Sequence, residues 1–357
     1  MKKAIIAMSG GVDSSVAALL TLQQNFECIG ATMKLYETGD IVCSDKTCCT
    51  ADDVEDARQV AAKLGIPYYV FNFCADFKKE VIERFIYAYE TGATPNPCIE
   101  CNKHLKFERL FDKMRELGFD YVVTGHYARI EYDNNSGRYL LKKAKDVSKD
   151  QSYVLYSLSQ AQLAHILFPL GEIEDKSVTR KIAEEHGFIN AKKSESQDIC
   201  FVPDGDYAAF IERYRGKTYP NGDFVDMQGN VLGVHKGIIR YTVGQRKGLG
   251  LALPRPMYVC KKDTEKNEVV LCYKEDLITK EVTAEHVNWI AIEKLDSPMR
   301  VKARLRYNQK EQPATVYDIG DGKIKVIFDE PASTPAAKGQ ALVMYDGDTV
   351  IGGGTII

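Results

Sequence analysis

The sequence contains no apolar stretch long enough to cross a membrane as a helix, which takes about 20 consecutive apolar residues. The apolar run from Ala4 to Met8 is followed at once by Ser-Gly-Gly, so it is too short for a secretory signal and is typical of a first buried strand. Internal repeats and low-complexity tracts are lacking as well. We therefore expect a cytoplasmic globular protein with no membrane partner, and its 357 residues predict two or three domains.

An excess of one charge is also lacking, because the formal net charge is only -3. The charge is unevenly distributed, however. Residues 205–275 carry 12 Lys and Arg against 8 Asp and Glu, whereas residues 276–357 carry 10 against 12. The basic middle segment is weak support for a nucleic-acid partner, since taken alone a solvated surface explains it better.

Strand-like and helix-like segments alternate in the first third of the chain. Strand patterns lie at 2–8, 27–34, 67–73 and 121–124, and helical patterns lie at 12–24, 51–64, 76–91 and 104–117. This alternation predicts an α/β fold, in which a parallel sheet carries helices on both faces.

After about residue 205, short alternating runs separated by Gly, Asp and Pro replace the helices. They lie at 233–241, 257–262, 268–273, 300–307, 314–317, 323–328 and 341–345. Such text predicts two small β-rich domains, the last a β-barrel. The predicted domains are residues 1–205 as the α/β domain, 206–275 as a central β-rich domain, and 276–357 as the C-terminal barrel.

A glycine turn, Ser9-Gly10-Gly11-Val12-Asp13-Ser14, lies between the first predicted strand and the first predicted helix. Paired glycines let the backbone approach a ligand closely, and the free amides that open a helix face an anion. Asp13 suits a site that also holds Mg²⁺. The turn ends in neither Gly-Lys-Ser/Thr nor a G-x-G-x-x-G pattern. It resembles the phosphate loop of the ATP pyrophosphatases, which split ATP between its first two phosphates, and argininosuccinate, GMP and NAD synthetases are similar here.

The chain has ten cysteines, although a protein of this length needs no disulfides for stability. Four of them lie in apolar text and are expected to be ordinary buried residues, namely Cys28, Cys74, Cys260 and Cys272. The other six lie in polar, loop-like text and require a different explanation, namely Cys43, Cys48, Cys49, Cys98, Cys101 and Cys200.

Two motifs carry the cysteines of most interest. The first cysteine motif, TPNPCIECNK at residues 94–103, has prolines on both sides of Asn96, which stiffen the loop that holds a thiol. Lys103 and His104 follow Cys101 closely and are expected to favour its thiolate. The second cysteine motif, SESQDICF at residues 194–201, ends a polar stretch with Cys200.

Six motifs together carry a family resemblance. They are SGGVDS at residues 9–14, TPNPCIECNK at 94–103, TGHYAR at 124–129, KDQSYVL at 149–155, SQDICFV at 196–202 and YTVGQRKGL at 241–249. In this order they resemble the tRNA-specific 2-thiouridylases, whose N-terminal domain is of the PP-loop, adenine nucleotide alpha hydrolase-like type. The resemblance extends over most of the chain.

The resemblance implies an ATP-dependent reaction on the wobble uridine, position 34, of tRNA. ATP adenylates the C2 oxygen, a persulfide on Cys200 attacks C2, and Cys101 attacks the persulfide, which leaves a Cys101–Cys200 disulfide. The products are 2-thiouridine, AMP and pyrophosphate. The reaction implies Mg²⁺ with the ATP, a sulfur donor protein (a cysteine desulfurase or a sulfur relay carrier) and a reductant for the disulfide.

The same resemblance implies the contact residues. For ATP they are Ala7, Met8, Ser9, Gly10, Gly11, Val12, Asp13, Ser14, Met33 and Gly125. For tRNA they are Asn96, Pro97, Cys98, His126, Lys149, Asp150, Gln151, Arg306, Tyr307 and Gln340, with Asn96 to Cys98 at the target base. Without the ordered motifs, His126 would be read as an ordinary histidine at a strand end, and Arg306 and Tyr307 as the solvent face of a strand.

Cys98 departs from the family pattern, because some members carry an aspartate there. It forms a C-x-x-C pair with Cys101, which permits three interpretations: a redox pair, half of a zinc site that lacks its second C-x-x-C, or three ligands of a [4Fe–4S] cluster with Cys200. In the last case sulfur would come from the cluster and not from a persulfide. The persulfide route is favoured, because both cysteine motifs fit it and a cluster needs all three thiols to converge.

Two functions of other kinds compete with tRNA thiolation. Another ATP pyrophosphatase acting on a small acid or amide would need neither basic β domains nor paired thiols. A nucleotide-gated RNA-binding protein without catalysis would retain its function when Cys200 is replaced.

Overall fold

The computed structural model describes residues 1–36, 51–193 and 199–357. Cys43, Cys48 and Cys49 lie outside the described residues, as do residues 194–198 of the second cysteine motif. No helix in the described part of the chain is both long and apolar enough to cross a membrane.

The N-terminal region is built on a five-stranded parallel sheet with the order β3-β2-β1-β4-β7. Its strands are β1 (Lys3–Ala7), β2 (Glu27–Lys34), β3 (Tyr68–Asn72), β4 (Tyr121–Val123) and β7 (Ile166–Leu167). The four strands predicted at 2–8, 27–34, 67–73 and 121–124 are therefore present. The two-residue strand β7 has no counterpart among the predictions, because so short a run has no readable period.

Helices cover both faces of this sheet, as the alternation predicted. Alternate residues of β1 enter two separate hydrophobic clusters: Ile5 joins one face and Ile6 the other. The Ile6 face packs against α1 (Val12–Gln23), α2 (Ala51–Leu64) and α8 (Lys176–Glu185). The Ile5 face packs against the helical run α3 (Cys74–Phe77), η1 (Lys78–Glu83) and α4 (Arg84–Glu90), and against α6 (Leu110–Glu116).

A second helical run leads from the first cysteine motif into α6. It consists of α5 (Pro97–Glu100) and the π-helix η2 (Cys101–Arg109), so the helix predicted at 104–117 begins earlier than its apolar pattern indicated. Asn96 begins the run as N-cap, since its side-chain oxygen accepts a hydrogen bond from the Cys98 amide at 3.1 Å. Pro97 at the first helical position suits this start.

The central region holds a four-stranded sheet with the order β10-β11-β8-β9. Its elements are α9 (Tyr207–Arg215), β8 (Gly222–Val225), β9 (Val231–His235), η6 (Ile238–Arg240), β10 (Tyr258–Asp263) and β11 (Glu268–Cys272). The strand predicted at 233–241 ends at His235. Gly237, with a φ of 102°, turns the chain there into a 3-10 turn.

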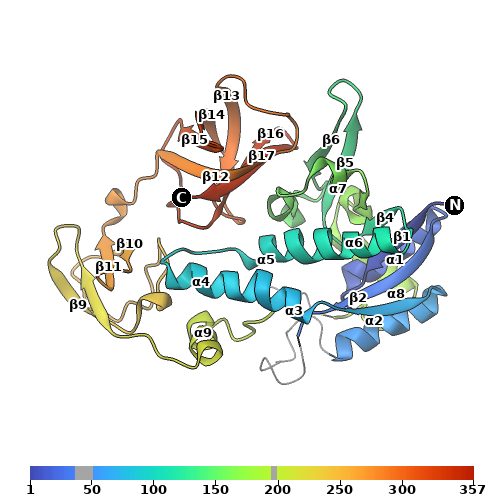
Figure 1. Cartoon of the computed structure of the whole chain (residues 1–357), viewed down its shortest axis with the longest axis horizontal. Helices are drawn as coiled ribbons and strands as arrows, with labels where there is room; N and C mark the ends of the chain where they lie inside the picture. The colour runs from blue at the N-terminus through green and yellow to red at the C-terminus, as the bar shows by residue number, and fades with distance from the viewer. Residues whose placement is uncertain (37–50, 194–198) are drawn as a thin grey trace.

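The C-terminal region is a closed six-stranded antiparallel barrel, as predicted. The order is β12-β15-β14-β13-β16-β17, and pairing of β12 with β17 closes it. The strands are β12 (Glu281–Trp289), β13 (Met299–Arg304), β14 (Gln312–Gly320), β15 (Lys323–Phe328), β16 (Ala341–Asp346) and β17 (Thr349–Ile356). Figure 1 shows the barrel in orange and red, with the parallel sheet and the strands β9–β11 toward opposite ends of the molecule.

A hairpin from the N-terminal region extends the barrel sheet. It consists of β5 (Ala128–Asp133) and β6 (Arg138–Lys143), and β6 pairs with β17 where Lys142 faces Thr349. An ion pair of 2.6 Å between Arg129 and Asp348 reinforces the junction. Residues of the first predicted domain therefore share a sheet with the last, while the domain boundaries at 205 and 275 stay predictions.

Candidate functional site

The carboxyl ends of β1 and β4 form the centre of the site. The chain leaves β1 toward β2 on one side, whereas β4 lies on its other side, so a crevice opens between their carboxyl ends. A cavity of about 180 Å³ lies there. It is lined by Ala7, Met8, Ser9, Asp13, Ser14, Met33, Lys106, Thr124, Gly125, His126 and Gln151.

Seven of the ten residues expected to contact ATP thus surround one cavity, and the other three, Gly10, Gly11 and Val12, belong to the same phosphate loop (residues 9–14). Gly11 is the N-cap of α1 and has no side chain to cap it, so the amides that open α1 remain available to an anion. Ser14 folds back over the loop: its hydroxyl donates to the Gly11 carbonyl at 2.9 Å and accepts from the Ser9 amide at 3.2 Å.

Gly10 has a φ of 74°, and a Cβ there would lie 2.3 Å from the carbonyl oxygen of Asp53 on α2. On its other side, the Asn190 side-chain amide donates to the Gly10 carbonyl at 2.9 Å. The loop is therefore clamped between α2 and the segment after α8. Gly125 is a second position at which only glycine fits, because a Cβ there would lie 2.9 Å from the Ser14 amide nitrogen.

We predict that Gly10→Ala destabilises the protein and weakens ATP binding. The left-handed backbone costs about 1–2 kcal/mol for a residue with a Cβ, and the contact with Asp53 adds to this cost. Denaturant unfolding and equilibrium ATP binding measure the two effects. Gly11→Ala is the matched control, because its φ is -89° and its Cβ would meet only the Ser9 hydroxyl at 3.5 Å. Equal stability of the two variants would contradict the clamp.

Among residues 1–36, 51–193 and 199–357, Asp13 is the only carboxylate that lines the cavity. Its two oxygens accept hydrogen bonds from the Tyr127 hydroxyl at 2.9 Å and from the Lys176 ammonium at 3.0 Å. Tyr127 is buried and is linked in turn to Thr179 on α8. One positioned carboxylate fits Mg²⁺, which proteins usually hold by one or two carboxylates together with substrate phosphates.

His126 lines the cavity between the carboxyl ends of β1 and β4, called the nucleotide cavity below, and is only 7% exposed. Its Nδ1 is 2.6 Å from the Thr124 hydroxyl and its Nε2 is 3.5 Å from the Lys106 ammonium. Burial, chiefly, and the positive charge of Lys106 hold the pKa of His126 well below its usual range. The imidazole is therefore neutral at physiological pH.

We predict that His126 makes the protein sensitive to mild acid. Below pH about 6.5 the unfolded chain binds a proton at this histidine and the folded chain does not, so stability falls as pH falls, by up to about 1.4 kcal/mol per pH unit. Urea unfolding at pH 7 and pH 5.5 should therefore show that the free energy of unfolding decreases less for His126→Gln than for wild type. His186→Gln, which changes an exposed histidine, should retain the wild-type loss. An unchanged pH dependence in His126→Gln would refute the assignment.

The two principal thiols contact the same hydrophobic cluster. Cys101 opens η2 and Cys200 precedes Phe201, and both cysteines are half-buried against the cluster on the Ile5 face of the sheet. Phe201 anchors the second segment, because it is 1% exposed and its ring meets Phe77 and Phe85 edge to face at 5.7 and 5.2 Å. Among the described cysteines, Cys98, Cys101 and Cys200 form no disulfide.

His104, which was expected to favour the Cys101 thiolate, contacts two carboxylates. Its Nδ1 is 2.7 Å from Glu108, and its Nε2 is 3.4 Å from Glu100. The bond to Glu100, chiefly, raises the pKa of His104. Any positive charge on this imidazole is therefore shared with two carboxylates.

The chain leading into the first cysteine motif is held by both β-rich regions. The Gln340 side chain donates to the Thr94 carbonyl at 2.6 Å, and the Thr94 amide donates to the Lys338 carbonyl at 2.7 Å. From the central sheet, Lys262 donates to the Ala93 carbonyl at 3.4 Å, and burial lowers the pKa of this lysine to about 8. Gln340, predicted to contact tRNA, is thus engaged inside the protein.

Asp150 is likewise engaged inside the protein. Its carboxylate is 6% exposed and accepts hydrogen bonds from Ser152 and from the Arg304 guanidinium at 3.1 Å. Tyr307 donates its hydroxyl to the Asp150 carbonyl at 3.0 Å. Burial, chiefly, and the charges of Asp150 and Cys98 raise the pKa of Tyr307, so Tyr307 lies near the first cysteine motif.

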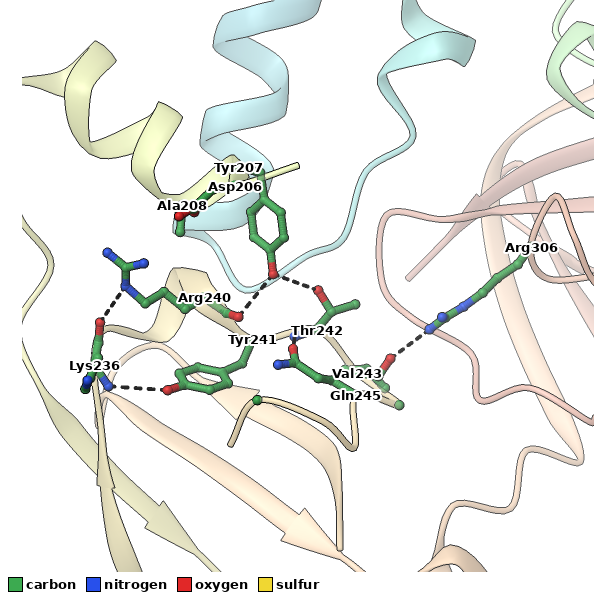
Figure 2. Close-up of a pocket in the computed structure, with 12 residues that line it drawn as sticks. Asp206, Tyr207, Ala208, Lys236, Arg240, Tyr241, Thr242, Val243, Gln245 and Arg306 are labelled. Atoms are coloured by element: carbon green, nitrogen blue, oxygen red, sulfur yellow. Dashed lines mark hydrogen bonds between the residues drawn. The ribbon is translucent and has the colours of Figure 1, made fainter. Parts of the chain in front are cut away.

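Arg306 lines a second, larger cavity of about 630 Å³ between α9, η6 and the barrel. Figure 2 shows its guanidinium reaching Val243, whose carbonyl oxygen accepts at 2.7 Å. Lys236 and Arg240 line the same cavity, although Arg240 is paired with Glu212 at 2.7 Å. The wall of this cavity is therefore basic and belongs to the segment that the charge count singled out.

The described cysteines are candidate ligands of a metal-binding group. Within residues 1–36, 51–193 and 199–357, no three Cys, His, Asp or Glu side chains are arranged to hold a metal ion. The iron–sulfur interpretation of Cys98, Cys101 and Cys200 thus receives no support from the geometry.

The residues of the site that were not predicted from the sequence include Lys106, Lys176 and Asn190. Lys176 and Asn190 reach the phosphate loop from positions more than 160 residues away, and no local pattern marks such contacts. The position of Lys106 in the sequence could have pointed to the site, because it lies in the predicted helix at 104–117, five residues after Cys101.

Comparisons with known proteins cover the whole chain. Three family models match in succession: the tRNA methyl transferase HUP domain over residues 2–204, the tRNA methyl transferase PRC-barrel domain over residues 208–273 and the aminomethyltransferase beta-barrel domain over residues 279–356. Among solved structures, an NMN synthetase from Francisella tularensis aligns with 61% of this chain and 79% of that chain at 17% identity and a TM-score of 0.34, which is too distant to bear on function.

Full-length relatives are much more similar. The tRNA-specific 2-thiouridylase MnmA of Clostridioides difficile (strain 630) is 52% identical over 355 residues, which cover 99% of this chain and 98% of that protein. The tRNA-specific 2-thiouridylase MnmA of Acetivibrio thermocellus is 52% identical over 359 residues, and 99% of each chain is covered.

Proposed function

The chain belongs to the family of tRNA-specific 2-thiouridylases, and from this premise we propose that it uses ATP to convert the wobble uridine of tRNA, position 34, to 2-thiouridine. One observation carries the proposal: the helix η2 begins with Cys101 and places Lys106 in the cavity beside the phosphate loop. A thiol and a nucleotide site thus share one rigid element.

The first step in this proposal is adenylation of the uridine. ATP lies in the cavity, with Ala7, Met8, Met33 and Gly125 along the nucleoside and the phosphate loop around the phosphates. The C2 oxygen attacks the α-phosphorus, the bond to the β-phosphate breaks, and pyrophosphate leaves with the electron pair while the N3 proton is lost to solvent. Asp13 would hold the Mg²⁺ that accompanies ATP, which supplies charge neutralisation for the phosphates.

The second step transfers sulfur. A sulfur donor protein, a cysteine desulfurase or a relay carrier, first loads Cys200 as a persulfide. The terminal sulfur attacks C2, and AMP leaves with the electrons of the carbon–oxygen bond. Cys101 thiolate then attacks the Cys200 sulfur, so the persulfide bond breaks, its electrons remain on the sulfur bound to C2, and a Cys101–Cys200 disulfide forms. A dithiol reductant returns two electrons to reset the pair.

The packing of the thiols supports this route. Cys101 and Cys200 both lie against the cluster on the Ile5 face, and neither is deeply buried. We propose tRNA contacts for Asn96, Pro97, Cys98, Lys149, Gln151, Arg306 and Tyr307. His126, Asp150 and Gln340 have side chains engaged inside the protein, so we propose that they support the RNA site by holding its frame.

We predict that Cys101→Ser and Cys200→Ser each abolish 2-thiouridine formation. Mass analysis of tRNA nucleosides, after incubation with ATP, a persulfide donor (a cysteine desulfurase with cysteine) and dithiothreitol, measures the product. Both variants should still release pyrophosphate from ATP in the presence of tRNA, because adenylation needs neither thiol. Cys272→Ser, a buried cysteine of the central sheet, is the matched control and should thiolate normally.

The outcomes separate the competing functions. Thiolation by both active-site variants would refute the roles of Cys101 and Cys200. Pyrophosphate release with a small acid or amide, and none with tRNA, would favour a different ATP pyrophosphatase. RNA binding gated by ATP, without turnover in wild type, would favour a non-catalytic binding protein.

We predict further that the protein thiolates tRNA without an iron–sulfur cluster. A sample purified without oxygen should contain no stoichiometric iron or acid-labile sulfide and should show no charge-transfer absorption, yet retain activity. Stoichiometric iron that is lost in Cys98→Ser together with activity would instead establish the cluster route.

A further inference from the structure

Lys106 brings a positive charge into the nucleotide cavity. Its side chain is half-buried and lines the cavity, and its ammonium lies 3.5 Å from Nε2 of His126. No carboxylate within the described parts of the chain forms an ion pair with Lys106. Asp13, the one acidic residue among the described residues of the cavity wall, is instead paired with Lys176 at 3.0 Å.

The histidine beside Lys106 cannot supply the missing negative charge. An ammonium only donates hydrogen bonds, so Nε2 of His126 must accept, and the ring proton lies on Nδ1, which donates to the Thr124 hydroxyl at 2.6 Å. The ring is buried between Phe107 and Phe168, with centroids 5.8 Å from each. His126 therefore orients the lysine as a neutral acceptor and leaves its full charge for a ligand.

The position of Lys106 indicates which phosphate group of ATP it contacts. The amides that open α1 and the Ser9 hydroxyl belong to the phosphate loop and suit the β- and γ-phosphates. Lys106 approaches from η2, the helix that begins with Cys101. The α-phosphorus, which the uridine oxygen attacks, has to lie between the phosphate loop and the thiols.

We propose that Lys106 binds the α-phosphate of ATP and stabilises the negative charge on its oxygens while the uridine C2 oxygen attacks. This inference rests on the proposed function both for the attacking group and for the choice of the α-phosphate, whereas a contact between Lys106 and a phosphate does not. A charged hydrogen bond aimed at an oxygen where charge develops contributes both to binding and to rate. Lys106 is thus a catalytic residue that links the nucleotide to the thiol-bearing helix.

Binding of adenosine, AMP and ATP to Lys106→Met, measured by titration calorimetry, tests the contact. Loss of one charged hydrogen bond should weaken AMP and ATP each by about 10- to 100-fold and leave adenosine unchanged. Lys106→Arg should restore most of the affinity, because it keeps the charge. Lys113→Met is the matched control, since Lys113 lies on α6, the continuation of η2, is 39% exposed and is paired with Glu116 at 2.6 Å. Thermal unfolding without nucleotide checks the fold, and Lys106→Gln replaces Lys106→Met if that variant is unfolded.

Three results would overturn the assignment. Wild-type affinity for AMP and ATP would remove the contact. A loss of affinity for ATP alone would mean that Lys106 contacts the β- or γ-phosphate. An equal loss of affinity for adenosine would mean that Lys106 only shapes the cavity and contacts no phosphate. Single-turnover pyrophosphate release with saturating ATP and tRNA should in addition fall at least 10-fold in Lys106→Met. A wild-type protein that binds AMP through Lys106 yet never thiolates tRNA would contradict the proposed function and leave the phosphate contact intact.

Discussion

The structure depends on the close approach of two backbones at the carboxyl edge of the parallel sheet. Gly125, just after β4, lies so near the amide of Ser14 that a side chain would not fit between them. This contact fixes the width of the crevice at the point where the order of strands reverses. The buried chain from Asp13 through Tyr127 to Thr179 then ties the phosphate loop to α8. A nucleotide site built on strand ends and a helix start is therefore preformed.

The two faces of the sheet carry different parts of the site, and the cavity lies at the sheet edge where the two faces meet. The phosphate loop opens α1, which packs on the Ile6 face, whereas Cys101 and Cys200 lie on the cluster of the Ile5 face. A base that reaches the sheet edge therefore has the phosphates on one side and the thiols on the other. The helix η2 spans this gap because it carries Cys101 at its start and Lys106 toward the cavity.

Much of this arrangement could be predicted from local sequence, because local patterns determine local structure. The period of apolar residues predicted four strands of the parallel sheet, and the glycine turn predicted the loop that joins β1 to α1 and lines the cavity. Contacts across long sequence distances could not be predicted: the hairpin β5–β6 joins the barrel through β17, and Asn190 reaches Gly10 from 180 residues away. Likewise, the resemblance singled out Asp150 and Gln340, but only the fold shows that their side chains are engaged inside the protein.

The β-rich regions hold the backbone that leads to the thiols. Thr94 has both its amide and its carbonyl bonded to the barrel, through Lys338 and Gln340. Lys262 of the central sheet holds the Ala93 carbonyl from another side, with its ammonium over the ring of Tyr89. Without the barrel, Thr94 would lose both of its backbone hydrogen-bond partners. The loop that the prolines on either side of Asn96 stiffen would then no longer be anchored at its start. Movement of the barrel on an RNA would therefore be transmitted through Thr94 directly to the helix that begins with the first cysteine motif.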